Sequence, residues 1–203
     1  MKNLLLLFLC LSSITCFSQK KDKREGAYSA YLYSVEVSKD FKVGTIDTLL
    51  SIYEDSIIKI DWNYASTQID FDLTNKSDQT LKIIWDDAAF ISLRNESSRI
   101  FHKGIKYIDR ENPQPPTSVY KKTTLSDLIA PTSYAIFVSG QNGDWHSDPL
   151  IPAASGSILS FKIEYIKGLI GQTMRVILPI KIEDKVIEYA FSFRTEFIEK
   201  KKK

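Results

Sequence analysis

Cysteine is nearly absent from this sequence. The 203 residues include only Cys10 and Cys16, and both lie close to the N-terminus. If an export signal ending at Ser18 is removed, the remaining chain has no disulfide, no thiolate nucleophile and no cysteine metal site. Small exported domains often depend on disulfides. Residues 19–203 are numerous enough to bury one sizeable hydrophobic core, so we expect that core alone to stabilise the fold.

A strong charge of one sign is also lacking, as are long apolar runs beyond the N-terminus. The formal net charge is +2, and a nucleic-acid surface would need a clustered basic face. We therefore expect no nucleic-acid partner. The apolar runs after residue 18 are too short for a membrane helix, so we expect no transmembrane span in the mature chain.

The N-terminus has the three parts of an export signal. Lys2 gives a short positive region, residues 4–11 form an apolar core, and a more polar stretch follows. Cleavage after Ser18 would leave Gln19 as the first residue, with the small residue Cys16 at position −3. The sequence thus predicts a signal peptide over 1–18 and a secreted protein of the periplasm or cell envelope.

Cys16 also permits a lipoprotein interpretation, in which the signal is cut just before a cysteine that is then acylated. Such signals usually have Leu at −3 and Gly, Ala or Ser at −1. Here those positions hold Ser13 and Thr15, so the match is poor. The alternative prediction is an outer-membrane lipoprotein with a lipid tether at Cys16.

Alternation of apolar and polar residues dominates the rest of the chain. This period of two is typical of strands with one buried face. The clearest rows of apolar residues are Ile58, Ile60 and Trp62; Ile69, Phe71 and Leu73; Leu81, Ile83 and Trp85; Leu159, Phe161, Ile163 and Tyr165; and Ile187, Tyr189, Phe191, Phe193 and Phe197.

Three further strands are predicted over 28–37, 133–138 and 172–182. Pro179 lies inside the last one, which predicts a sheet edge or a bulge there. Polar turns are expected at 54–56, 75–78 and 183–185. Two long loops are expected, at about 109–132 and 140–156, with a single helical turn at 125–129.

These patterns predict an all-β fold of two packed antiparallel sheets, with a closed barrel as the alternative. A signal peptide over 1–18 and a charged leader over 19–27 would precede one domain spanning 28–198. A basic tail over 199–203 would follow.

The sequence offers little catalytic chemistry. His102 and His146 lie far apart, and no serine lies in a Gly-x-Ser-x-Gly motif. No His-Glu-x-x-His motif is present, and a catalytic zinc would need three protein ligands. Both histidines are interpreted as structural or surface residues, and we expect no catalytic residue, no metal and no cofactor.

The segment from Gln141 to Pro149 is the most suggestive stretch for ligand binding. Oxygen- and nitrogen-bearing side chains recur there at every second residue, a spacing that can wrap a calcium ion. The EF-hand pattern is not met, because Ser147 and Ala153 occupy the positions of its Gly and Glu. The candidate ligand-loop residues are Asn142, Asp144, Trp145, His146 and Asp148.

A pair of carboxylates follows Trp85. Asp86 and Asp87 are neighbours, and neighbours on a strand point to opposite faces. A glycosidase needs two carboxylates roughly 5–10 Å apart in a cleft. This pair is therefore expected not to converge unless a bulge intervenes.

One resemblance bears on the fold. The residues are "IIKIDWNYASTQIDFDLTNKSDQTLKIIWDDAAFI", then "SSRIFHKGIKY", a Pro-rich loop, "LIAP" and finally "DKVIEYAFSF". Together these resemble uncharacterised secreted proteins and lipoproteins of Gram-negative bacteria with an immunoglobulin-like β-sandwich. The resemblance implies that fold and transfers no activity.

The leading functional hypothesis is an exported, non-catalytic β-sandwich that binds a protein or glycan of the cell envelope. A hydrolase of envelope polymers using Asp86 or Asp144 is one alternative. A calcium-stabilised adhesion module using the 142–148 loop is the other. A histidine joined to a carboxylate and a hydroxyl in one pocket would count against the leading hypothesis.

Overall fold

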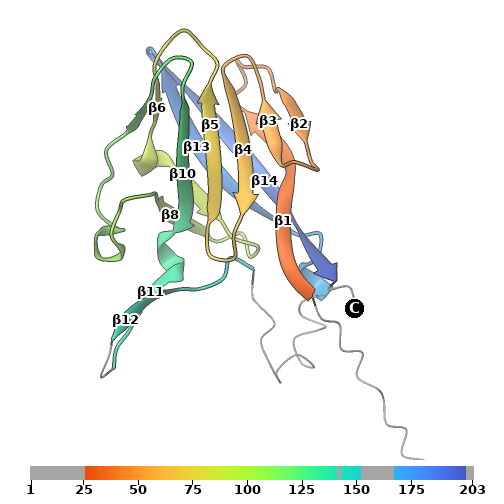
Figure 1. Ribbon diagram of the computed structural model, residues 1–203, viewed down its shortest axis with the longest axis vertical. Helices are drawn as coiled ribbons and strands as arrows, with labels where there is room; N and C mark the ends of the chain where they lie inside the picture. The colour runs from red at the N-terminus through yellow and green to blue at the C-terminus, as the bar shows by residue number, and fades with distance from the viewer. Residues whose placement is uncertain (1–25, 141–142, 152–166, 200–203) are drawn as a thin grey trace, which may run out of the picture.

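A computed structural model describes residues 26–140, 143–151 and 167–199. These residues form an antiparallel all-β protein (Figure 1). Its strands are β1 (Gly26–Val37), β2 (Thr45–Asp47), β3 (Ile52–Glu54), β4 (Ile58–Tyr64), β5 (Ile69–Asn75), β6 (Leu81–Ile83), β7 (Ala89–Ile91), β8 (Ser97–Phe101), β9 (Thr117–Val119), β10 (Thr124–Pro131), β11 (Ala135–Val138), β12 (Asp144–Ser147), β13 (Thr173–Ile182) and β14 (Lys185–Glu199).

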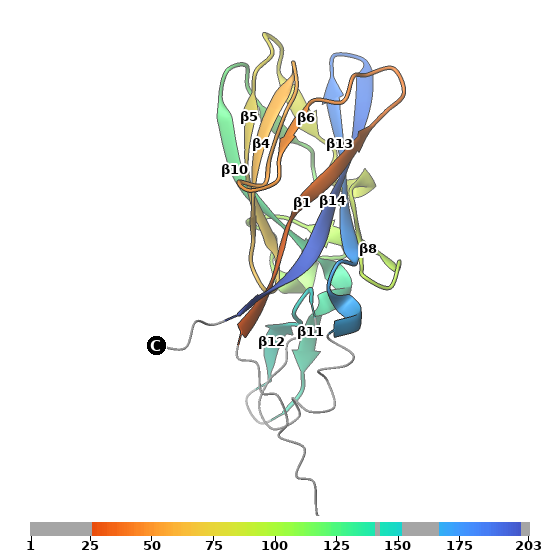
Figure 2. The same cartoon turned by 90° about the vertical axis from the view of Figure 1, so that its right-hand side faces the viewer.

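One large sheet makes up the body of the molecule. Its order is β1-β14-β13-β7-β8-β10-β5-β4-β3-β2, while β6 pairs with β13 and β9 pairs with β6. The sheet folds over so that β4, β5 and β10 face β1, β13 and β14 (Figure 2), and β1 also contacts β2 and β4. Apart from β11 and β12, which form a separate two-stranded sheet, the described strands form one nearly closed sheet that is closer to the barrel alternative than to two packed sheets.

The alternating rows predict β4 and β5 closely. Ile58, Ile60 and Trp62 are buried along β4, and the apolar row of β5 is buried beside them. The register pairs Trp62 with Phe71. A shift of one residue would turn both rows towards solvent, so burial fixes this register.

The longest strands carry the core of the opposite layer. β13 and β14 pair from Thr173–Arg194 to Ile182–Lys185, which confirms the turn predicted at 183–185. Met174, Val176, Leu178 and Ile180 of β13 are fully buried. Burying an aliphatic side chain of this size stabilises the fold by about 1.5–3 kcal/mol, before entropy is counted.

Pro179 was predicted at an edge or a bulge, and that prediction is wrong. It lies in an interior strand, paired in regular register with Glu188. On its other side β13 pairs with β7 at residues 175–177 and with β6 at residues 180–182. Pro179 falls between the two paired stretches, where its carbonyl accepts a hydrogen bond of 3.0 Å from the Ile84 N–H and its missing N–H lies outside both pairings.

The prediction of a long loop at 109–132 is also wrong. This segment contains β9 and the whole of β10, which pairs with β5 through residues 124–129. The helical turn expected at 125–129 is therefore extended strand. The loop was predicted from Pro113, Pro115, Pro116 and Pro131, and the buried carboxylate of Asp127 at an inward position interrupts the apolar alternation of β10.

Smaller differences concern the ends of two predicted strands and one predicted loop. The strand expected to end in Trp85 stops at Ile83, and the short 3-10 helix η1 (Trp85–Asp87) follows. The strand expected at 133–138 begins with another 3-10 helix, η3 (Thr132–Tyr134), and the loop expected at 140–156 contains β12. The row at 159–165 lies outside the described residues.

Both ends of the described chain meet in one strand pair. Gly26 of β1 lies opposite Glu199 of β14. The strands thus begin two residues before the expected start at residue 28 and end one residue after the expected end at 198. The predicted turns at 54–56 and 75–78 are confirmed, since they join β3 to β4 and β5 to β6.

Candidate functional site

A buried polar cluster lies where β8, η1 and β10 meet. The rings of Trp85 and His102 stack with centroids 4.3 Å apart and planes 6° apart. His102 Nδ1 is 3.2 Å from Asp127 Oδ2, and only 12% of the His102 side chain and 5% of the Asp127 side chain are exposed. The name Trp85 cluster is used below for Trp85, His102, Asp127, Gln114 and Thr117.

Asp127 also satisfies backbone groups at this junction. Its Oδ1 accepts hydrogen bonds of 2.8 Å from the backbone N–H groups of Lys103 and Leu128. β8 pairs with β10 only at Ala130 and Pro131, so these two N–H groups need another acceptor. The carboxylate replaces a backbone partner where the two strands separate.

Gln114 and Thr117 complete the cluster. Gln114 lies in the Pro-rich segment, residues 113–116, and Thr117 is the first residue of β9. Gln114 Nε2 donates to the carbonyl of Ile100 at 2.6 Å, and its Oε1 accepts from the His102 N–H at 3.3 Å. Thr117 Oγ1 accepts from Trp85 Nε1 at 2.7 Å. These contacts fasten the segment across the end of β8.

The cluster contains a histidine–carboxylate pair, which is half of a hydrolytic triad. A triad also needs a hydroxyl within hydrogen-bond reach of the second ring nitrogen. His102 Nε2 is buried and has no hydrogen-bond partner among the described residues. The pair instead joins β8 to β10, since His102 lies directly after β8 and Asp127 lies in β10.

The two carboxylates after Trp85 do not form an acid–base pair. Asp86 Oδ1 accepts from Arg99 Nη2 at 2.9 Å and from the backbone N–H of Gln114 at 3.0 Å. Asp87 is exposed at the end of η1. Asp86 thus joins η1 to β8 and to the Pro-rich segment.

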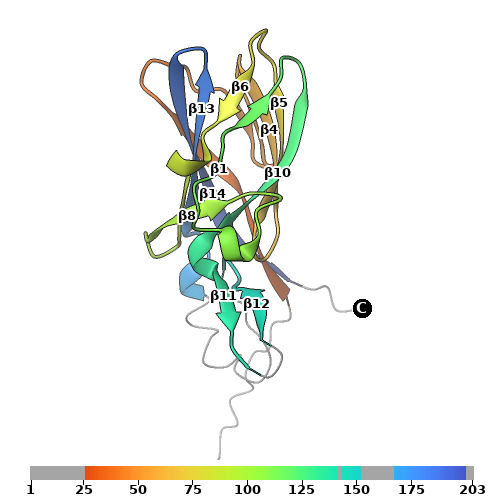
Figure 3. The same ribbon diagram turned by 90° about the vertical axis from the view of Figure 1, so that its left-hand side faces the viewer.

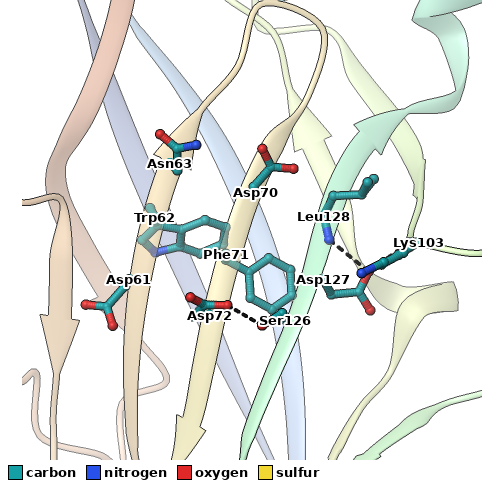
Figure 4. A pocket seen from close by; sticks show the side chains of 10 residues that line it. All are labelled: Asp61, Trp62, Asn63, Asp70, Phe71, Asp72, Lys103, Ser126, Asp127 and Leu128. Atoms are coloured by element: carbon teal, nitrogen blue, oxygen red, sulfur yellow. Dashed lines mark hydrogen bonds between the residues drawn. The ribbon is translucent and has the colours of Figure 1, made fainter.

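An open hollow of about 430 Å³ lies on the outer face of β4, β5 and β10. Asp61, Asp70 and Asp72 line it from two adjacent strands (Figure 4). Asp61 lies directly opposite Asp72, a like-charge arrangement that destabilises a sheet unless it is compensated. Lys59 Nζ at 3.1 Å from Asp61, and Ser126 bonded to Asp72, supply that compensation.

The predicted ligand loop is largely strand. Asp144, Trp145 and His146 belong to β12, which pairs with β11 from Ala135–Ser147 to Val138–Asp144. Successive strand residues point to opposite faces, so Asp144 and His146 lie on one face and Trp145 on the other. Asp148 follows the strand, and Asn142 lies outside the described residues.

Trp145, which lies opposite Phe137 in this hairpin, packs against Tyr107 and Arg110. Its ring stacks on Tyr107 at 5.9 Å and lies 4.7 Å from the guanidinium carbon of Arg110. Tyr107 also shares a hydrogen bond of 3.1 Å with Ser147. The hairpin is thereby anchored to η2 (Tyr107–Asp109).

The hairpin also carries an exposed apolar row, although Ala135 at its start is buried. Ile136, Phe137 and Val138 are consecutive in β11, with exposed fractions of 41%, 54% and 49%. Figure 3 shows β11 and β12 projecting from the end of the large sheet. Sequence reasoning selected Trp145 and did not single out this apolar row, which was predicted only as part of a strand over 133–138.

No group of three or more metal-ligating side chains occurs in the residues that the structure describes. The calcium hypothesis stays a prediction, because Asn142 is not among them. The predicted cleavage site at Ser18 and Gln19, and the alternative lipid site at Cys16, also lie outside the described residues. Within the described ranges, no helix is long and apolar enough to cross a membrane.

Comparison with known proteins adds no functional assignment. No protein-family model, curated protein or solved structure matches this chain. Any function must therefore be argued from its own residues.

Proposed function

We propose that this is an exported, non-catalytic protein that acts by binding at the cell envelope. The observation that carries the proposal is the exposed apolar row Ile136, Phe137 and Val138 on the projecting β11–β12 hairpin. Contiguous exposed apolar side chains mark interaction surfaces in proteins that otherwise bury such groups.

The N-terminal pattern supports export. A positive residue, an apolar core and a small residue at −1 precede Gln19. The absence of cysteine after Cys16 agrees with a core that needs no thiol chemistry outside the cytoplasm. An acylated Cys16 remains the alternative form of the same proposal.

The Trp85 cluster supports a non-catalytic role. The histidine–carboxylate pair that a hydrolase would use is present, yet His102 Nε2 is buried and unpartnered among the described residues. Both Asp127 oxygens are occupied by strand N–H groups and by His102. A group that already satisfies buried backbone donors is poorly placed to shuttle protons to a substrate.

We also propose kinship with the immunoglobulin-like sandwiches of secreted bacterial proteins and lipoproteins. The facing antiparallel layers and the buried Trp62 between them support this. Backbone hydrogen bonds joining β1 to β4, detected by NMR, would instead favour a barrel.

Cell fractionation tests the proposal. The full-length chain, expressed in a Gram-negative host, is expected in the envelope or the medium, with Gln19 or acylated Cys16 as its first residue by mass spectrometry. A chain that stays in the cytosol with Met1 to Ser18 attached would overturn export. Glycan or peptide hydrolysis that disappears in Asp86→Asn or Asp144→Asn would overturn the non-catalytic role.

A further inference from the structure

We propose that the outer face of β1, β14 and β13 binds the carboxylate or phosphate groups of an acidic glycan. The inference rests on the proposed function, identifies its partner and assigns that partner to a second surface. The three strands lie side by side in the large sheet (Figure 2). The name arginine face is used below for Tyr31, Tyr33, Arg175, Ser192 and Arg194.

The register of the sheet brings these side chains together. Arg194 of β14 lies opposite Tyr31 of β1, and Ser192 lies opposite Arg175 of β13. Phe193 is buried in the core, so its neighbours Ser192 and Arg194 point outward. Arg175 and Arg194 are therefore diagonal neighbours on one face. Ser192 is only 7% exposed although it points outward, so the side chains around it cover it.

The two arginines carry positive charge that the protein does not neutralise. Arg99 and Arg110 each form an ion pair with a carboxylate. Among the residues that the structure describes, the side chains of Arg175 and Arg194 form no ion pair and no hydrogen bond. Glu196 is the next outward residue of β14, and it forms no ion pair with Arg194. Like charges side by side destabilise a sheet, and an anion bound from outside would compensate them.

Tyr33 holds the guanidinium of Arg194 in place. Arg194 Cζ lies 3.4 Å from the centre of the Tyr33 ring, which covers one flat side of the guanidinium. Tyr33 lies where the register of β1 against β14 shifts, between Leu32 and Ser34. Because Arg194 Nε is buried, a ligand would contact the two terminal nitrogens. Their N–H groups lie in the guanidinium plane and suit bidentate binding of a carboxylate or a phosphate.

The composition of the face favours a glycan over a protein. The centre of a protein interface is usually apolar, whereas the residues beside the arginines carry hydroxyl groups, with Thr173 opposite Arg194 and Ser34 opposite Ser192. Tyr33 is 42% exposed. Its ring offers an apolar surface to the C–H groups of a sugar, and its hydroxyl and the guanidinium beside it can bind polar groups.

Calorimetric titration of the full chain tests the inference. The probes are oligogalacturonate, which carries a carboxylate on every sugar, and a phosphorylated mannose oligomer. At least one of them should bind, and the tighter one identifies the preferred anion. A neutral galactose oligomer of the same length should not bind. Raising the salt concentration to about 0.5 M should weaken binding several-fold, because salt screens exposed charges.

Matched variants locate binding on the arginine face. Arg194→Gln and Arg175→Gln should each weaken binding about tenfold, since each removes a charge-assisted contact. Arg194→Lys keeps the charge without the planar fork and should recover only part of the affinity. Lys82→Gln is the control, because Lys82 is exposed in β6, opposite Lys181 near the far end of β13. It should bind as the unchanged protein does, and circular dichroism should show that all four variants are folded.

Three outcomes would overturn the inference. Neither acidic glycan binds, or Lys82→Gln weakens binding as much as Arg194→Gln, or polyglutamate binds as tightly as the glycans and so indicates an acidic protein partner. Envelope localisation in any of these cases would leave the proposed function standing with a different partner. Cytosolic retention would instead remove the proposed function itself.

Discussion

Two buried tryptophans sit in opposite surroundings. Trp62 packs against three aromatic rings, with centroids 5.2 Å from Phe71, 4.9 Å from Phe191 and 5.2 Å from Phe193. These four residues are called the aromatic cluster below. The indole of Trp85 stacks on His102 and donates to Thr117. Trp62 Nε1, by contrast, is buried without a hydrogen-bond partner among the described residues.

The difference shows two ways of filling one core. The aromatic cluster stabilises by buried apolar area and edge-to-face contacts, which tolerate imperfect geometry. The Trp85 cluster stabilises by matching each donor to an acceptor, which demands specific residues. Removing one polar atom should therefore change the stability of the aromatic cluster little and should destabilise the Trp85 cluster.

The largest expected effect is in the aromatic cluster. Phe191→Ala should lower the free energy of unfolding by about 4 kcal/mol, because a fully buried ring leaves a cavity beside Trp62 and Tyr53. Urea unfolding followed by circular dichroism measures this. Phe191→Leu, the matched control, should cost less than half as much. Equal losses would mean that the ring contacts themselves, rather than the cavity, set the cost.

The next effect is in the Trp85 cluster. Asp127→Ala should cost about 3 kcal/mol, since the N–H groups of Lys103 and Leu128 lose their acceptor and His102 loses its buried partner. Asp127→Asn keeps one oxygen that can accept both bonds and should cost about 1 kcal/mol. If the two variants are equally destabilised by urea, the N–H groups are not what Asp127 satisfies.

A smaller effect is expected when Trp85 Nε1 loses its hydrogen-bond partner and so comes to resemble Trp62 Nε1. Thr117→Val removes the acceptor of Trp85 Nε1 and should cost about 1.5 kcal/mol. Thr117→Ser keeps the hydroxyl and should cost less. A thermal melt compares the pair, and a neutral Thr117→Val would show that a buried indole N–H is tolerated here as it is at Trp62.

The smallest effect concerns alkaline pH and the tyrosines near the aromatic cluster. Burial raises the pKa of Tyr64 to about 12, and burial also raises the pKa of Tyr53 and Tyr189. A tyrosine ionises more readily in the unfolded chain, where its pKa is near 10. Stability is therefore complete below pH 10 and falls as pH rises from 10 to 12.

Tyr64→Phe tests that effect. The variant has no proton to lose at this position, so its urea midpoint should fall less between pH 9 and pH 11 than that of the unchanged protein. Tyr120→Phe, at an exposed position, should leave the slope unchanged. Parallel curves for all three proteins would contradict the assignment.

Sequence reasoning worked where burial alone decides structure. β4, β5, β13 and β14 were predicted nearly in full, because most of their inward positions hold apolar residues, with Asn75 and Thr195 as buried polar residues near strand ends. Sequence reasoning failed at β10, because Asp127 at an inward position interrupts the apolar pattern of that strand. A carboxylate in a sequence is usually taken to be exposed. Only the structure shows that His102 lies beside Asp127 and makes its burial possible.

The candidate surfaces show the same limit. Trp145 was singled out by its polar neighbours, yet its role depends on Tyr107 and Arg110, distant in the sequence. Ile136, Phe137 and Val138 have the composition of a core strand. Only the tertiary structure shows that β11 pairs with β12 alone and stays outside the main sheet.

The pairing of Gly26 with Glu199 has a mechanical consequence. Because β1 and β14 are antiparallel, both chain ends leave the same end of one strand pair. A load applied between those ends would open this ladder one hydrogen bond at a time, like a zipper, and never shear many bonds at once. A protein held by its N-terminus and pulled at its C-terminus would yield at low force, and its first unfolded segments would be β1 and β14.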